Sequence, residues 1–178
     1  GIEGIYFLED TKRVYPYGSV AGQILGVVGV DGDGLSGLEL YYNSILEGTD
    51  GEMLMETGED GTPIAGAASD VTEAQDGTDI VISIDINIQQ VAEEQISAGV
   101  TQYSADSGSV MVTDPQTGEI LAACSTPLLD LTDTSRATTA AYTLKLASSA
   151  YQPGSIFKVL TAAIGIDSGL MNPEPTWY

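Results

Sequence analysis

The amino-acid sequence predicts an α+β fold with two differently patterned parts. Residues 1–77 are rich in glycine and aspartate, and short apolar runs alternate there with turn signals such as DGDG and GEDG. Residues 78–178 contain longer segments with the periods of strands and helices. With 178 residues, 43% of them hydrophobic, the chain can bury a core. We therefore expect one domain over residues 1–77 and a second over residues 78–178.

In the first part we expect short strands, loops and one helix over residues 36–48. Ser36 and Glu39 have the spacing of a capping box, and Gly48 suits the end of a helix. The apolar face of this helix would consist of Leu38, Tyr41, Tyr42, Ile45 and Leu46.

The segment VDGDGLSGLE, residues 30–39, has some features of a calcium-binding loop. Leu35 and Tyr42 stand, however, where such a loop needs an oxygen ligand and a glutamate. We interpret the segment as a structural turn and expect no metal site and no cofactor.

The second part begins with a predicted strand over residues 78–85 and an amphipathic helix over residues 86–100. Residues 108–126 form two β-rich runs around a proline and glycine turn, which predicts a hairpin. Residues 130–150 are expected to be mostly loop with at most one short helix. A last helix is predicted over residues 155–170, with Ser155 at its start and a glycine near its end.

Composition restricts the chemistry that the chain can perform. Five lysines and arginines stand against 26 aspartates and glutamates, and this net charge of −21 would repel nucleic acids and anionic membrane surfaces. There is no histidine, so any acid–base chemistry must use other side chains. The one cysteine, Cys124, lies in an apolar run and is predicted to be a small buried residue. Apolar runs are shorter than the roughly 20 residues of a membrane span, so we expect no membrane contact by this chain.

The stretch YQPGSIFKVL, residues 151–160, places Ser155 and Lys158 three positions apart. On a helix these side chains would share a face, so the lysine amine, when uncharged, could accept the proton of the serine hydroxyl. Free N–H groups at the helix start could stabilise an oxyanion, as acyl transfer requires. The alternative is that Ser155 only caps the helix, since serine is a favoured cap. The Ser-x-x-Lys pattern alone does not decide between the two.

The surroundings of Ser155 resemble the active-site motif of the class B penicillin-binding proteins, the D,D-transpeptidases that cross-link peptidoglycan, in which Pro-Gly-Ser-x-x-Lys opens the catalytic helix. Four further segments resemble motifs of the same family, in the same order. They are RVYPYG (13–18), GLSGLELYYNSILEGTDG (34–51), ISIDINIQ (82–89) and DPQTGEILA (114–122).

The resemblance implies a fold and a role for each site residue. Residues 1–77 would be a β-rich pedestal, or dimerisation, domain lacking its N-terminal part, and residues 78–178 the first part of a serine transpeptidase domain. Ser155 would be the nucleophile, acylated by peptidoglycan stem peptides or by β-lactams, and Lys158 its base. Arg13 and Glu39 would form an ion pair in the pedestal.

The resemblance also implies a location and partners. The parent protein would be anchored at the extracytoplasmic face of the bacterial membrane by a helix absent from this chain. It would work with other proteins of cell-wall synthesis. The family's later Ser-x-Asn and Lys-Thr-Gly motifs do not occur here. We therefore expect no turnover from residues 1–178 alone, and self-association through residues 78–178.

Two alternatives stay open at this point. One is a serine β-lactamase or β-lactam sensor domain, which shares the Ser-x-x-Lys pattern. The other is a non-catalytic pedestal module that docks to cell-wall synthesis proteins, in which Ser155 is only a cap.

Overall fold

The computed structural model describes residues 12–58, 64, 69–172 and 174. The chain divides into two compact units, one that reaches to Ser148 and one that begins at Ser149. These are called the first unit and the second unit below. Helices occur in both, and two antiparallel two-stranded sheets lie in the first, so the predicted α+β class is confirmed.

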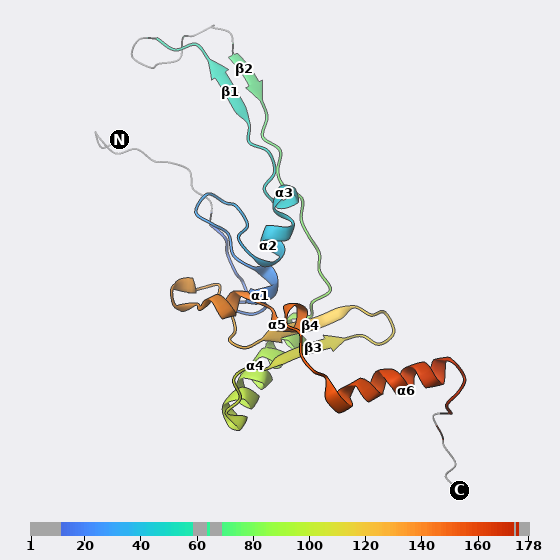
Figure 1. The fold of residues 1–178 in the computed structure, drawn as a ribbon. Coiled ribbons are helices and arrows are strands. Elements are labelled where there is room, and N and C mark those ends of the chain that lie inside the picture. The colour runs from blue at the N-terminus through green and yellow to red at the C-terminus, as the bar shows by residue number, and fades with distance from the viewer. Residues whose placement is uncertain (1–11, 59–63, 65–68, 173, 175–178) are drawn as a thin grey trace. The chain divides into compact units, whose positions relative to one another are not determined.

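The first unit carries most of the regular structure (Figure 1). Its helices and strands follow the chain in this order: α1 (Gly22–Leu25), α2 (Gly37–Tyr41), α3 (Asn43–Leu46), β1 (Glu52–Met55), β2 (Ser69–Thr72), α4 (Ile86–Tyr103), β3 (Ser109–Thr113), β4 (Ile120–Ser125), the 3₁₀ turns η1 (Thr134–Arg136) and η2 (Thr139–Tyr142), and α5 (Lys145–Ser148). The second unit consists of the 3₁₀ turn η3 (Gly154–Phe157) and helix α6 (Lys158–Asp167).

The prediction of one helix over residues 36–48 is wrong. The backbone of Tyr42, with φ −108° and ψ 17°, separates α2 from α3. The capping box does not form either, because both of its side chains have other partners. The Ser36 hydroxyl accepts a hydrogen bond from the backbone N–H of Val27 at 3.2 Å, and Glu39 binds Arg13 at 2.8 Å. The ion pair expected between Arg13 and Glu39 is therefore confirmed.

The segment interpreted as a structural turn does form one. The N–H of Gly29 donates to the carbonyl of Asp33 at 2.7 Å, and an isolated β-bridge joins Val28 to Gly34. Further along the chain, β1 and β2 pair in register from Glu52 opposite Thr72 to Met55 opposite Ser69, which makes a two-stranded ribbon.

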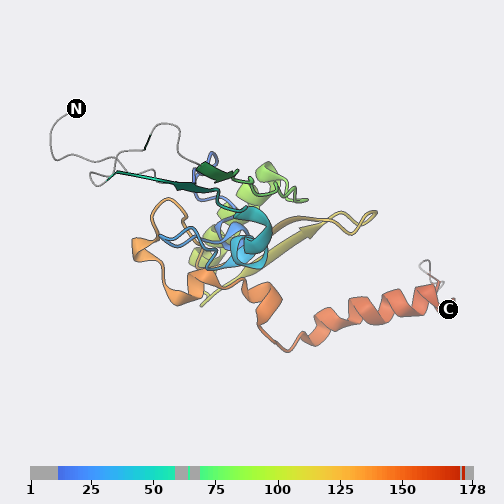
Figure 2. The same cartoon turned by 90° about the horizontal axis from the view of Figure 1, so that it is seen from above.

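Helix α4 and the β3–β4 hairpin, both predicted, pack together and form one of the core clusters of the first unit (Figures 1 and 2). The Asp85 side chain caps α4 by accepting from the N–H groups of Asn87 and Ile88 at 2.9 and 3.0 Å. Apolar residues of α4 then pack on one face of the hairpin. This cluster contains Ala92, Ala122 and Cys124, with Ile88, Ile96, Val110, Val112 and Leu128 packed against it.

A second core cluster connects the loop after β4 to the segment around α1. Its buried members are Leu129, Leu131 and Ala141, and Tyr15, Leu25, Val27, Ala137 and Tyr142 pack around them. Residues 130–150 are mostly loop, as predicted, although they contain two 3₁₀ turns as well as one short helix.

The predicted strand over residues 78–85 is not a strand in the structure. A strand requires a ladder of backbone hydrogen bonds, and this segment has one such bond to the β4 side, from the Asp85 N–H to the Leu121 carbonyl at 2.9 Å. The Ser83 hydroxyl adds a bond to the Ile120 carbonyl at 2.7 Å. Ile82, Ile84 and Ile86 line a cavity that is described below, and residues 78–85 do not join a paired sheet.

Candidate active site

Ser155 lies in the 3₁₀ turn η3, directly before helix α6. The predicted helix over residues 155–170 is thus divided into a tighter first turn and an α-helix that begins at Lys158. A 3₁₀ turn has 3.0 residues per turn, so side chains three positions apart lie above one another. The N–H of Lys158 donates to the carbonyl of Ser155, which closes this turn. Ser155 and Lys158 therefore project from the same side of the chain.

The interpretation of Ser155 as a helix cap is wrong. The residue in the N-cap position is Pro153 for η3 and Phe157 for α6, and no side chain caps either element. Among the described residues, no hydrogen bond uses the Ser155 hydroxyl, which is exposed. The hydroxyl is therefore not committed to a structural role.

Lys158 is also exposed, and within the described part of the second unit its amine forms no ion pair. It is the single cationic residue of residues 149–178. The unit thus supplies the serine and the lysine, but neither the burial nor the second cation that would favour an uncharged amine.

Large apolar side chains of η3, α6 and the following turn are exposed as well. An exposed apolar surface of this extent is typical of a face that packs against other protein. Its members in η3, α6 and the following turn are Ile156, Phe157, Val159, Leu160, Ile164, Ile166, Leu170 and Met171.

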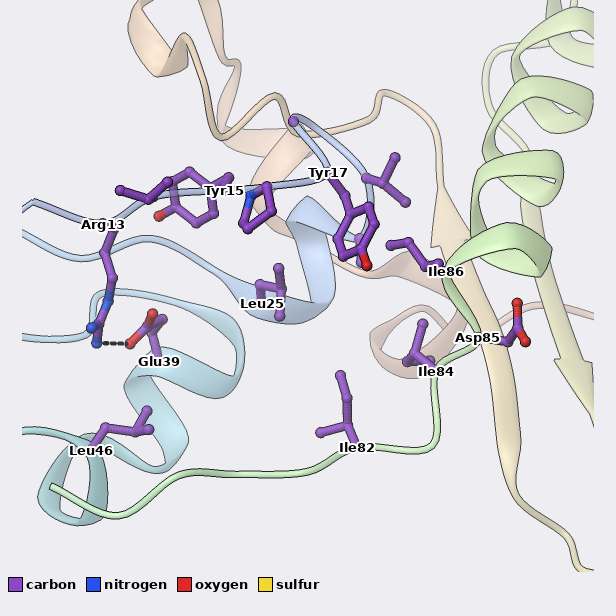
Figure 3. A pocket seen from close by; sticks show the side chains of 15 residues that line it. Arg13, Tyr15, Tyr17, Leu25, Glu39, Leu46, Ile82, Ile84, Asp85 and Ile86 are labelled. Atoms are coloured by element: carbon purple, nitrogen blue, oxygen red, sulfur yellow. Dashed lines mark hydrogen bonds and ion pairs between the residues drawn. The ribbon is translucent and has the colours of Figure 1, made fainter.

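The first unit contains a separate cavity of about 660 Å³ (Figure 3). Figure 3 shows Tyr17, Leu25, Ile82 and Ile84 around it, with the Arg13–Glu39 ion pair on one side. Its lining consists of Arg13, Val14, Tyr15, Pro16, Tyr17, Gly18, Val20, Ala21, Leu25, Glu39, Leu46, Ile82, Ile84, Asp85 and Ile86. Sequence reasoning missed this cavity, although the alternation of isoleucines at 82, 84 and 86 was a usable signal.

The charges beside the cavity affect Tyr15. Partial burial, and then the nearby Glu39 carboxylate, raise the pKa of Tyr15 above its ordinary value, while the Arg13 guanidinium opposes the shift. Tyr15 therefore stays protonated at neutral pH and is not a candidate nucleophile.

Cys124 is buried, as predicted, at the centre of the α4–hairpin core. Burial, followed by the negative charge of Glu93, raises the pKa of its thiol to about 11. A thiol in this state is a poor nucleophile, so Ser155 remains the candidate.

Two family patterns match the chain in sequence order. Residues 1–82 match the penicillin-binding protein dimerisation domain, and residues 108–177 match the penicillin-binding protein transpeptidase domain. Both the Arg13–Glu39 pair and Ser155 with Lys158 fall inside these matches. A β-lactamase or sensor domain would leave the match over residues 1–82 unexplained.

Individual proteins give the same result. The chain is 33% identical to stage V sporulation protein D of Bacillus subtilis over 96% of its own length and 27% of that protein. It is 34% identical to a probable peptidoglycan D,D-transpeptidase, PenA, of Neisseria gonorrhoeae, over 95% of its length and 29% of that protein.

Solved structures agree in fold. A putative peptidoglycan glycosyltransferase from Atopobium parvulum has 48% sequence identity and a TM-score of 0.73, over 93% of this chain and 35% of that one. Penicillin-binding protein 3 of Mycobacterium tuberculosis, in complex with aztreonam, has 29% identity and a TM-score of 0.74, over 93% and 34%. The chain thus spans about a third or less of the proteins it matches. It belongs to the class B penicillin-binding proteins, and it carries a dimerisation domain and the first part of a transpeptidase domain.

Proposed function

We propose that the complete protein is a serine D,D-transpeptidase that cross-links peptidoglycan stem peptides, with Ser155 as nucleophile and Lys158 as its base. One observation carries this proposal. The Ser155 hydroxyl is exposed and free of any capping role, in a turn that puts Lys158 on the same side of the chain. The similarity to the Neisseria protein, a probable peptidoglycan D,D-transpeptidase, supports it.

The chemistry follows from these two side chains. The Ser155 oxygen adds to the carbonyl carbon of the penultimate D-alanine while the Lys158 amine takes the hydroxyl proton. The peptide C–N bond then breaks, and the proton passes to the departing amine of the terminal D-alanine. An amine of a neighbouring stem peptide attacks the resulting ester, which forms the cross-link and returns the hydroxyl to Ser155. The backbone N–H of Ser155 would be one donor to the oxyanion.

The same serine would be acylated by β-lactams, whose strained ring amide takes the place of the peptide bond. Structures of the Mycobacterium tuberculosis relative in complex with aztreonam and with ampicillin support this expectation. Residues 1–178 alone would lack turnover, because the second unit leaves Lys158 exposed and without a neighbouring cation.

Peptidoglycan synthesis would place the complete protein at the extracytoplasmic face of the bacterial membrane, beside other proteins of cell-wall synthesis. In the part of the chain that the structure describes, no helix combines the length and the apolar character that a membrane crossing requires.

Labelling of the complete protein by a fluorescent penicillin tests the proposal. Ser155→Ala should abolish labelling, and Lys158→Ala should slow it by about 10² to 10⁴. Ser149→Ala, which removes another exposed hydroxyl of the second unit, should label like the unchanged protein. Labelling that survives Ser155→Ala would remove this serine from the mechanism.

A further inference from the structure

Three buried polar side chains join α1 to the body formed by α4 and β4. Gln23 is 7% exposed, Gln89 is completely buried, and Glu93 is 9% exposed. Among the described residues, every buried side-chain nitrogen or oxygen has a hydrogen-bond partner. A fully satisfied buried network of this kind fixes the arrangement of the elements it joins.

The Gln23 amide holds two stretches of backbone together. Its oxygen accepts from the N–H of Ser125, the last residue of β4, at 2.9 Å. Its nitrogen donates to the carbonyls of Pro127 and Ala141 at 3.0 and 2.9 Å. An amide nitrogen has two hydrogens, and these two carbonyls are its nearer acceptors, with the Thr143 carbonyl further away at 3.5 Å. One side chain of α1 thus joins the end of β4 to both ends of the loop that follows it.

Glu93 and Gln89 fix α1 and β4 to helix α4. The Glu93 carboxylate accepts from the N–H of Ala21 at 2.9 Å and from the Gln89 amide at 2.7 Å. The same Gln89 amide exchanges hydrogen bonds with the backbone of Ala123, donating at 3.0 Å and accepting at 2.8 Å. The position of α1 is therefore determined from both sides, by α4 and by β4.

Backbone packing reinforces this arrangement. A Cβ atom added to Gly22 would lie 2.1 Å from the carbonyl oxygen of Leu129, so the main chain of α1 lies directly against the loop that Gln23 binds. Leu25 of α1 packs on the cluster of Leu129, Leu131 and Ala141 in the same loop.

We propose that Gln23 is a positioning residue for acylation of the active-site serine. The stretch that it binds, residues 125–141, leads through η2 and α5 directly into the second unit and the Ser155 turn. This inference rests on the proposed function of Ser155. Gln23 belongs to the match with the dimerisation domain, whereas the stretch that it binds belongs to the match with the transpeptidase domain. A displacement of α1 would displace residues 125–141, the stretch from which the chain continues through α5 to the Ser155 turn.

The test compares Gln23→Met with Gln90→Met in the complete protein. Methionine keeps the length of glutamine but cannot form its hydrogen bonds. Gln90 lies on the exposed side of α4, and in the described part of the chain its side chain binds Glu94, so its variant is the control. Hydrogen exchange is measured in peptides that cover residues 121–128 and 137–146. Acylation by a fluorescent penicillin is resolved into the Kd of the non-covalent complex and the first-order acylation rate constant.

Gln23→Met should raise exchange in both peptides and lower the acylation rate constant by about tenfold, with Kd within about twofold, because a small misplacement of a reacting group is costly. Gln90→Met should change neither quantity. A purely structural role would not lower the rate constant of a folded protein in which Kd is preserved.

Faster exchange with an unchanged acylation rate constant would overturn the positioning role. If Gln23→Met does not fold, Gln23→Asn is measured instead. Its amide is one methylene too short to reach both stretches, and acylation at the unchanged rate would overturn the proposal equally. The Ser155→Ala variant separates the two proposals. Labelling that survives Ser155→Ala removes the proposed function and the positioning role with it, whereas loss of labelling in Ser155→Ala with normal acylation in Gln23→Met removes the positioning role alone.

Discussion

The guanidinium of Arg13 donates a 2.8 Å hydrogen bond to the carboxylate of Glu39, 26 positions further along the chain. The contact joins the segment before α1 to helix α2, beside the cavity of the first unit. The Arg13 side chain is 48% exposed and that of Glu39 is 16% exposed, so solvent partly screens the pair.

Glu39→Gln should therefore lower the free energy of unfolding by only about 1 kcal/mol. Urea unfolding followed by circular dichroism gives this value, and a double-mutant cycle with Arg13→Met isolates the pair. Glu94→Gln, an exposed carboxylate on α4, is the control and should cost less. A coupling energy of zero would mean that the ion pair does not stabilise the pedestal.

Two glycines with similar φ angles but different surroundings should respond differently to alanine. Gly26 has φ +85°, and an added Cβ atom would meet the carbonyl oxygen of Ser36 at 1.9 Å. Gly118, in the β3–β4 turn, has φ +80° and open space around it. We expect Gly118→Ala to cost about 1 kcal/mol through backbone strain and Gly26→Ala to cost about 3 kcal/mol or more. Urea unfolding of both variants tests the difference, and equal costs would show that the contact at Ser36 relaxes freely.

The Cys124 thiol should be unreactive in the folded protein. Its pKa is raised by burial from the ordinary 9.0 to about 11, so at pH 8 the thiolate is scarce and inaccessible. Ellman's reagent should react slowly with the native protein and quickly in urea. Rapid reaction of the native protein at pH 8 would contradict the buried placement.

The same shift makes stability depend on pH. The unfolded chain loses the thiol proton near pH 9 and the folded protein near pH 11, so the unfolded state binds fewer protons between these values. The contribution of Cys124 to stability is therefore complete below pH 9 and declines as the pH rises toward 11. Unfolding free energies measured across this window should fall more steeply for the unchanged protein than for Cys124→Ala.

Helix α4 should depend on the cap that Asp85 supplies. Asp85→Ala leaves the N–H groups of Asn87 and Ile88 without their side-chain partner and should cost about 1 kcal/mol of unfolding free energy. Asp85→Asn keeps an oxygen acceptor and should cost less. Asp106→Ala, which removes an exposed carboxylate in the turn after α4, is the charge-matched control.

Self-association of residues 1–178 through residues 78–178 remains a prediction. The exposed apolar side chains of η3 and α6, among them Phe157, Val159 and Ile164, support it. Sedimentation should show concentration-dependent association, and Val159→Glu combined with Ile164→Glu should weaken it. A monomer at high protein concentration in the unchanged chain would contradict the prediction.

Local signals predicted the elements that local interactions determine. The helical period predicted α4, and the turn at Pro115 and Gly118 predicted the hairpin. The helix over residues 36–48 begins after Ser36, as predicted, but no local signal indicated the break at Tyr42, and Val27 and Arg13 take the two side chains of its capping box. Tertiary partners prevailed over local propensity there. The prediction of a strand over residues 78–85 was wrong for a related reason, since the alternation of apolar and polar residues does not by itself supply a hydrogen-bonding partner.

In the candidate site, too, local features could be predicted from the sequence and those that depend on distant residues could not. Ser155 and Lys158 were identified from a short motif, and their common side follows from one tight turn. Gln23 has no motif around it, and its partners Ser125, Pro127 and Ala141 are 102, 104 and 118 positions away. A role that depends on such distant backbone atoms cannot be inferred from one sequence.

The close approach of the Gly22 backbone to the Leu129 carbonyl limits which sequences of this family can be joined in a chimera. A chimera joined at residue 77 would combine one parent's α1 with another parent's α4 and β4. The hydrogen bonds of Gln23 would form in this chimera only if the parent that supplies α1 had glycine at position 22 and a side-chain amide at position 23. Otherwise the two parts would not fit together even where both parents fold, because the contacts of α1 with α4 and with the loop after β4 cross the joint at residue 77.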